Sequence, residues 1–204
     1  MLDMTQWLSA WSAAVLGEFG EERVRFLGLQ GSRARGEARE DSDIDAVVIL
    51  DVLTAGDMAC YAACTSALPE RGRLCGFIAG EEELRRWESS ELFQFYHDTR
   101  PLRGSLDFLL PRLDRRAALG SARTGAGAVY HGCAHYLLNG GGEAALDGLR
   151  KGAFFTLRAL RYLETGEFPP SRSALPDADR RLLSAGAEEL FGWASETLRA
   201  LGGE

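Results

Sequence analysis

The sequence has no excess of basic residues. Its 204 residues include 23 Lys and Arg against 30 Asp and Glu, so the formal net charge at pH 7 is -7. Because a negative surface repels a phosphate backbone, this balance argues against broad nucleic-acid binding or polymerisation. The same charge favours cationic small molecules near the surface.

The sequence also lacks a long hydrophobic run at its start. The first nineteen residues include Asp3, have no basic segment, and place polar residues such as Gln6 and Ser9 between the apolar ones. These features argue against a signal peptide and against a membrane span. We therefore expect a cytoplasmic protein without a membrane partner.

Common metal and phosphate motifs are missing too. The four cysteines form no CxxC pair, so we expect reduced thiols and no zinc site. Gly31 and Gly36 have the spacing of a Walker loop, but Glu37 occupies the place of its lysine, and no GxGxxG opens a helix. His131 and His135 lie one helical turn apart without an evident third ligand, so we interpret them as packing residues.

The hydrophobic pattern changes along the chain. Strand-like patterns end before residue 113, and the rest is helical, which predicts an α+β class. We expect an N-terminal domain over 1–112, with a small mixed β-sheet and flanking helices, and an all-α helical bundle domain over 113–204. The predicted strands are 23–30, 43–50, 73–80 and 106–110. The predicted helices are 1–19, 54–68, one or two within 81–98, 116–138, 143–165 and 178–201.

Two aspartates, Asp43 and Asp45, stand at the entrance of the apolar segment 43–50. Residues two apart in a strand project from the same face, so the two carboxylates converge. Like charges that close repel each other, and a divalent ion with hard oxygen ligands, such as Mg²⁺, removes that repulsion. The spacing therefore predicts a magnesium site.

A glycine-serine turn, Gly31-Ser32, follows the preceding strand about a dozen residues earlier. Glycine allows backbone N–H groups to approach an anion closely, the serine hydroxyl adds a donor, and a helix beginning here would favour phosphate. Together with the aspartates, the turn can hold a triphosphate between backbone donors and metal ions. That arrangement suits phosphoryl or nucleotidyl transfer.

The segment "GLQGSRARGEAREDSDIDAVVI" resembles the signature of the nucleotidyltransferase superfamily, which has the DNA polymerase β-like fold. That signature is an apolar strand, Gly-Ser, a short helix, and Asp-x-Asp entering a second strand. The compact size and helical second half are similar to small bacterial nucleotidyltransferases. These include aminoglycoside nucleotidyltransferases and the minimal nucleotidyltransferases of toxin–antitoxin pairs.

The resemblance assigns roles to individual residues. It implies that Gly31 and Ser32 contact the nucleotide phosphates, that Asp43 and Asp45 are catalytic residues that bind magnesium, and that Ser42 shapes the turn into the strand. Arg33 is either a nucleotide-binding residue or a surface residue. In related enzymes the helical half closes over the active site, so Lys151 could contact the triphosphate. The alternative is that Lys151 lies in a solvated basic stripe. For Arg158 we favour the solvated stripe.

A third carboxylate, which members of this superfamily usually bring from a later strand, is not evident. In the predicted strand 73–80 its expected place falls near Cys75. Asp107, inside an otherwise apolar stretch, is the candidate for a third catalytic acid, and the alternative is that it caps or turns the chain. Without it, the base could come from another residue, and the candidates are Glu91, His97 and Asp98.

The resemblance implies a Mg²⁺-dependent nucleotidyltransferase. It would move a nucleoside monophosphate from a nucleoside triphosphate, with ATP the expected substrate, to a hydroxyl acceptor such as an aminoglycoside. One alternative is an antitoxin-type transferase that modifies or masks a toxin-like partner protein. Another is a catalytically silent nucleotide-binding module. A homodimer is compatible with either.

Overall fold

The structure is a computed structural model that describes residues 2–202. It forms two compact units. The first contains the chain up to Trp87 together with Asp98–Leu110, and the second contains Glu88–His97 and the chain from Pro111 onward. The two domains expected from the sequence, a nucleotidyltransferase domain over 1–112 and a helical domain over 113–204, stay a prediction.

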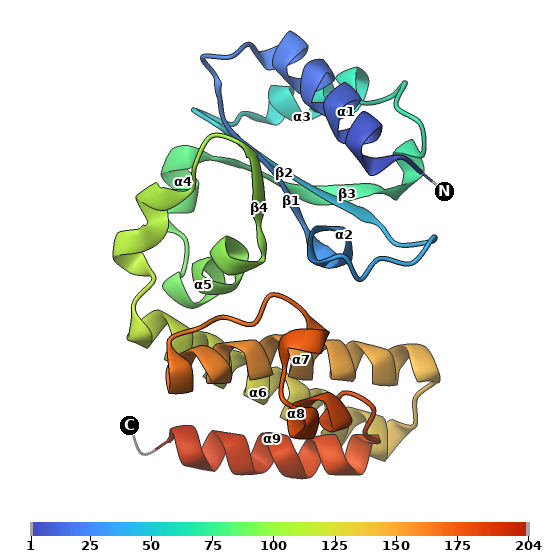
Figure 1. Ribbon diagram of the computed structural model, residues 1–204, viewed down its shortest axis with the longest axis vertical. Coiled ribbons are helices and arrows are strands. Elements are labelled where there is room, and N and C mark those ends of the chain that lie inside the picture. The colour runs from blue at the N-terminus through green and yellow to red at the C-terminus, as the bar shows by residue number, and fades with distance from the viewer. Residues whose placement is uncertain (1, 203–204) are drawn as a thin grey trace. The chain divides into compact units, whose positions relative to one another are not determined.

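The first unit is built on one four-stranded sheet (Figure 1). Its strand order is β3-β2-β1-β4, with β2 and β3 parallel and the other neighbouring pairs antiparallel. The mixed sheet and the helical second part confirm the α+β class. The strands are β1 (Val24–Gln30), β2 (Ile44–Leu50), β3 (Leu74–Gly80) and β4 (Arg100–Arg103).

The strand predicted at 106–110 is wrong. The fourth strand is β4, whose four residues are all exposed, and residues 107–112 form a 3₁₀ helix, η2 (Asp107–Arg112). Leu106 and Leu109 are the buried residues of this segment. Their spacing of three suits a 3₁₀ turn, whereas a strand that buries one face requires a spacing of two.

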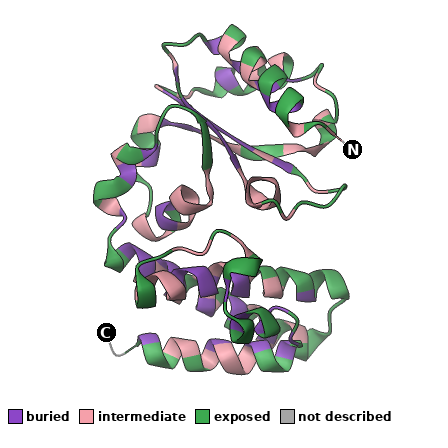
Figure 2. Cartoon of the chain, in the orientation of Figure 1, coloured by how far each residue is buried: buried purple, intermediate pink, exposed green. Residues whose placement is uncertain are grey.

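The core of the first unit lies between the sheet and two helices, α1 (Met4–Phe19) and α3 (Ala55–Cys64), which cover one face (Figure 1). Figure 2 shows burial along β1 and β2, as expected for central strands with long apolar runs. The remaining helical elements of this unit are α2 (Gly31–Arg35), η1 (Arg71–Arg73) and α4 (Glu81–Arg86).

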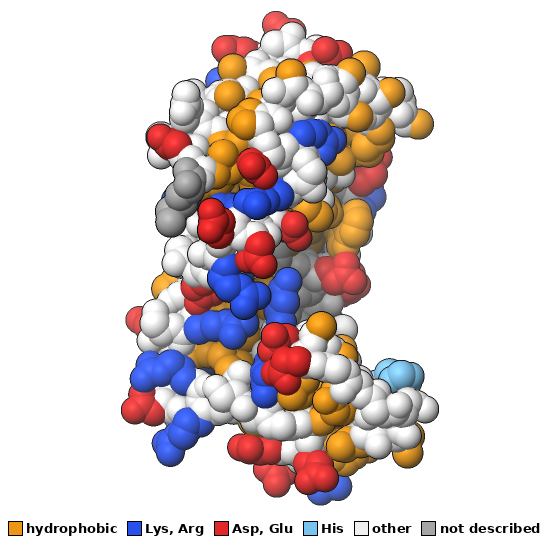
Figure 3. All heavy atoms as spheres, turned by 90° about the vertical axis from the view of Figure 1, so that its right-hand side faces the viewer, with side chains coloured by type: hydrophobic (Ala, Val, Ile, Leu, Met, Phe, Trp, Pro, Cys, Tyr) orange, Lys and Arg blue, Asp and Glu red, His pale blue; other side chains and the backbone are white. Residues whose placement is uncertain are grey.

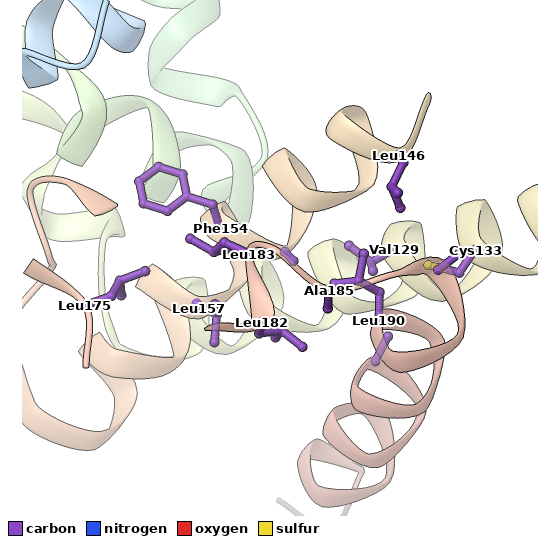
Figure 4. Packing of buried hydrophobic residues seen from close by; sticks show 13 residues of the cluster. Val129, Cys133, Leu146, Phe154, Leu157, Leu175, Leu182, Leu183, Ala185 and Leu190 are labelled. Carbon is purple, nitrogen blue, oxygen red and sulfur yellow. The ribbon is translucent and has the colours of Figure 1, made fainter. Parts of the chain in front are cut away.

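The second unit is helical. Its core is a cluster of buried apolar side chains that includes Phe154, Leu157 and Leu190 (Figure 4). The helix predicted over 178–201 is interrupted, since Leu183–Gly186 separates its two parts. The elements are α5 (Ser89–Asp98), α6 (Arg115–Asn139), α7 (Glu143–Thr165), η3 (Arg172–Ala174), α8 (Asp177–Leu182) and α9 (Ala187–Leu201).

No helix among the described residues combines the length and the apolarity that a membrane span requires. On the face of the molecule in Figure 3, acidic and basic side chains are intermixed. Many arginines are paired with carboxylates, such as Arg23 with Asp57 and Arg161 with Asp179.

Arg158 is not part of a solvated stripe. Its side chain is buried, and its guanidinium lies 4.2 Å from the ring centroid of Phe168 and donates from Nε to the carbonyl of Pro169. The ring of His97 also stacks on Phe168, with the two ring centroids 4.6 Å apart. Burial, together with the nearby Arg158 charge, lowers the pKa of His97 to about 4.

Replacing His97 with phenylalanine is expected to flatten the pH dependence of unfolding between about pH 4 and 6.5. In the native chain the pKa of His97 is about 4, below the ordinary value of 6.5, so the unfolded chain binds more protons in this window. Stability therefore rises with pH across the window and is lost as the pH falls from about 6.5 to about 4. Urea unfolding at closely spaced pH values measures this slope.

The matched control is His131→Phe, which removes an exposed histidine from α6. This variant should keep the slope of the wild type. If His97→Phe and the wild type share one slope, the half-buried neutral imidazole of His97 does not cause the pH dependence of unfolding.

Candidate active site

The site is built where β1 ends and β2 begins. The two strands are antiparallel, and Gln30 pairs with Asp45, so Gly31 emerges beside this aspartate. Gly31 has φ +72°, and a Cβ on it would lie 1.9 Å from Oδ2 of Asp45. The carboxylate thus packs against the bare Cα of the glycine, which no other residue type would allow.

Asp43 is exposed and lies two residues before the half-buried Asp45, at the entrance to β2. Arg33 holds the backbone here, donating from Nε to the carbonyl of Asp43 (2.9 Å) and from Nη2 to that of Ser42 (2.6 Å). The hydroxyl of Ser42 accepts from the backbone N–H of Arg39 at 2.9 Å and closes the turn. Arg33 therefore acts on the position of Asp43 through the backbone.

Ser32 is the second residue of the short helix α2. Within residues 2–202 its hydroxyl makes no hydrogen bond, and the first N–H groups of a helix have no intrahelical partner. Donors of both kinds are therefore present in the turn that begins at Gly31, the residue packed against the Asp45 carboxylate. Gly36, also at φ +72°, ends this helix.

A buried ion network fixes α2 in place. Nη1 of Arg35 donates to both carboxylate oxygens of Asp98, at 2.9 and 2.8 Å, and its Nε donates to Glu37 at 2.9 Å. The Arg35 and Asp98 side chains are 9% and 11% exposed. Burial acts to lower the pKa of Arg35, but the two carboxylates raise it above its ordinary value, so the guanidinium stays charged.

Cys75 is the residue of β3 that pairs with Asp45 of β2. Paired residues of parallel neighbouring strands point to the same face of the sheet, about 4.8 Å apart. The thiol is exposed. The sulfur thus stands next to Asp45 on the side where a third acid was expected from the sequence.

Asp107 does not join the two aspartates. Because β4 runs antiparallel to β1, Arg100 pairs with Leu29 near the site, and the chain leaves the sheet past Leu27. The Phe108 ring then lies 4.3 Å below the guanidinium of Arg85 in α4, which follows the far end of β3. The register thus puts Asp107 at the end of the sheet opposite the site.

Of the other predicted residues, Lys151, Glu91 and His97 lie in the second unit, and Asp98 lies in the first. Lys151 is exposed on α7, and its contact with a triphosphate stays a prediction. Of the alternative bases, Glu91 and His97 are in α5, where His97 packs among aromatic rings. The remaining one, Asp98, is held by Arg35. No sequence signal reveals that last pair, because 63 residues separate its members.

The sequence comparisons agree with this geometry. Residues 14–95 match the family described as "Nucleotidyltransferase domain", a range that contains the glycine turn, both aspartates and Cys75. The match confirms the resemblance to the nucleotidyltransferase superfamily. No curated protein matches the chain.

A solved structure shares the fold. It is the spectinomycin adenyltransferase AAD(9) from Enterococcus faecialis, crystallised with ATP and spectinomycin. The TM-score is 0.51 at 13% sequence identity, and the alignment covers 98% of each chain. The likeness therefore concerns the fold, and it extends over the helical second part as well as the residues that the family matches.

Proposed function

We propose that the protein is a magnesium-dependent nucleotidyltransferase. The observation that supports this most directly is the Asp45 carboxylate seated on the Cα of Gly31, with Asp43 two residues before it. The glycine turn, which we propose binds phosphate, and the two carboxylates, which we propose bind metal, thus lie at one end of one sheet. The family match is independent support.

The donor set fits Mg²⁺. Mg²⁺ takes oxygen ligands and is commonly held by one or two carboxylates, with water and substrate phosphates completing the shell. Asp43 and Asp45 would supply such carboxylates, and among the described residues no group of three His, Cys, Asp or Glu side chains could hold a metal ion. When bound, the ion would neutralise phosphate charge and polarise the α-phosphate.

In the proposed reaction, Gly31 and Ser32 hold the outer phosphates of the triphosphate. Asp43 and Asp45 would hold the magnesium ion, which would supply charge neutralisation beside the α-phosphate. The acceptor hydroxyl oxygen forms a bond to the α-phosphorus, and the bond from that phosphorus to the β-bridging oxygen breaks. Pyrophosphate leaves, and the hydroxyl proton passes to water or to a basic group of the acceptor. Arg33 keeps Asp43 in position throughout.

We propose ATP as the nucleotide and a cationic amino sugar or aminocyclitol as the acceptor. The solved structure with the same fold was crystallised with ATP and spectinomycin. The charge of -7 favours a positively charged acceptor. A cytoplasmic location, a homodimer and a toxin-like partner stay predictions.

Pyrophosphate release tests the proposal. We expect release from ATP with magnesium that depends on the acceptor, when purified protein is given each of the four nucleoside triphosphates and pools of aminocyclitols and aminoglycosides. EDTA should abolish it. Mass spectrometry of the acceptor should show the added nucleoside monophosphate. Failure of every small-molecule pool would contradict this acceptor class and direct the search to partner proteins.

A catalytically silent nucleotide-binding module is the second candidate. The observation that favours it is the thiol of Cys75, in register with Asp45 where a third acid was expected. Such a module would bind ATP in the presence of magnesium but release no pyrophosphate with any acceptor. The same assay, run beside a binding measurement, separates the two candidates.

A further inference from the structure

The second unit contains a hollow of about 440 Å³ that is lined by its own residues alone. The lining comes from the start of α5 and from residues 112–123, around the first half of α6. It includes neither aspartate of the candidate active site. Its volume lies within the range typical of small-molecule pockets, about 300–1,000 Å³.

Three arginines and two serines face this hollow: Arg112, Arg116, Arg123, Ser89 and Ser90. Arginine and serine side chains are both suited to phosphate, because guanidinium groups form charge-assisted, bidentate hydrogen bonds with its oxygens and hydroxyl groups donate to them. The first turn of the ten-residue helix α5 adds backbone N–H groups beside the two serines.

Two of the arginines are held by the protein itself. Nη2 of Arg112 donates to the hydroxyl of Ser89 at 3.0 Å, and Nε of Arg123 donates to the carbonyl of Leu201 at 3.1 Å. Arg116 is exposed and makes no hydrogen bond or ion pair with another residue in the range 2–202. The hollow thus combines two oriented guanidinium groups with one that is available to a ligand.

The acids in the lining are fewer. Asp114 caps α6, where Oδ1 accepts from the backbone N–H of Ala117 at 2.9 Å, and Glu88 is exposed at the start of α5. Three positive charges face two negative ones, and one of the two carboxylates is committed to the helix cap. The remaining excess of positive charge is modest, so a ligand must gain binding free energy from directed hydrogen bonds as well as from charge attraction.

We propose that this hollow is a second ligand site, one that takes a phosphate-bearing small molecule. The volume exceeds that of a single phosphate ion, which leaves room for a second phosphate or for the organic part of the ligand. The site lies entirely within the second unit and does not depend on the proposed transferase activity.

Isothermal titration calorimetry with pyrophosphate, inorganic phosphate and AMP tests the site. The chain carries Asp43→Asn and Asp45→Asn and is kept in EDTA, so that the magnesium-dependent site does not contribute. We expect saturable binding of at least one probe. If AMP binds more tightly than the inorganic probes, the ligand has an organic part, and the reverse order of affinities indicates an inorganic ligand. Arg116→Gln in this background should weaken binding at least about tenfold.

Arg181→Gln is the matched control, since it removes an exposed arginine from α8 in the same unit. It should leave the affinity unchanged. The site is overturned if none of the three probes binds saturably, or if Arg116→Gln and Arg112→Gln bind as tightly as the parent. Magnesium-dependent ATP binding by the wild type, measured separately, shows whether the proposed function stands in either case.

Discussion

Gly31→Ala is expected to abolish most of the transferase activity, with a loss of at least about 100-fold, while the chain still folds. A Cβ at this position would lie 1.9 Å from Oδ2 and 2.8 Å from Cγ of Asp45, so the carboxylate must move away. A displacement of about 1 Å in a reacting site can reduce the rate about 100-fold. The assay is acceptor-dependent pyrophosphate release, with thermal unfolding measured in parallel.

The structure offers a close control for this substitution. Gly36 has the same φ of +72°, but a Cβ there meets nothing within 4 Å. Alanine in this left-handed conformation costs about 1–2 kcal/mol at either position. Gly31→Ala and Gly36→Ala should therefore lose similar stability, and Gly31→Ala alone should lose activity. Equal activity in the two variants would contradict the proposal that Gly31 is required because the Asp45 carboxylate packs against its Cα.

Cys75→Glu is expected to raise the rate of transfer about 100-fold or more. Cys75 pairs with Asp45 across parallel strands, and its side chain is exposed, so a glutamate there has room beside Asp43 and Asp45, the proposed magnesium ligands. A positioned general base contributes about 10²–10⁴ to a reaction rate. Single-turnover measurement of the adenylylated acceptor, over a range of pH, would detect the faster rate. It would also detect a new fall in rate at the acidic side of the pH–rate profile, where the glutamate becomes protonated.

Cys75→Gln has the same length without the charge and serves as the control. It should stay at the rate of the wild type. If Cys75→Glu is no faster than Cys75→Gln, the wild-type reaction does not lack a base at this place. The proton would then be accepted by a group elsewhere in the protein.

The turn and the two aspartates could be predicted from the sequence because their signals are local. β-branched and apolar runs define β1 and β2, and Gly31 and Asp45 stand at the ends of these runs, so antiparallel pairing brings them together. The strand that contains Cys75 was predicted in the same way, from a third apolar run, whereas the expectation of a third acid near Cys75 came from the resemblance to the superfamily. Periodicity also predicted the helical second part, with α7 at the residues observed.

The remaining features depend on contacts between distant segments. The Arg35–Asp98 pair and the burial of Arg158 among aromatic rings have no local pattern, since arginine is usually exposed and its partners here are set by packing. The exposed edge strand β4 carries no alternation of apolar residues, so the apolar stretch after it was taken for the strand. Asp107 was a candidate third acid because it is an acidic residue inside that apolar stretch.

Calorimetric titration of ATP, with magnesium and with EDTA, tests the central claim most directly because it requires no acceptor. Three proteins are compared: the wild type, the double variant Asp43→Asn plus Asp45→Asn, and Asp41→Asn. Asp41 is a suitable control because its side chain is 83% exposed in the same loop.

We predict that magnesium strengthens ATP binding to the wild type and to Asp41→Asn. In the double variant this gain should be lost, which lowers the affinity about 10–100-fold, as expected when charge-assisted contacts of about 1.5–3 kcal/mol disappear. Magnesium-dependent binding that persists unchanged in the double variant would contradict the assignment of Asp43 and Asp45 as the magnesium ligands.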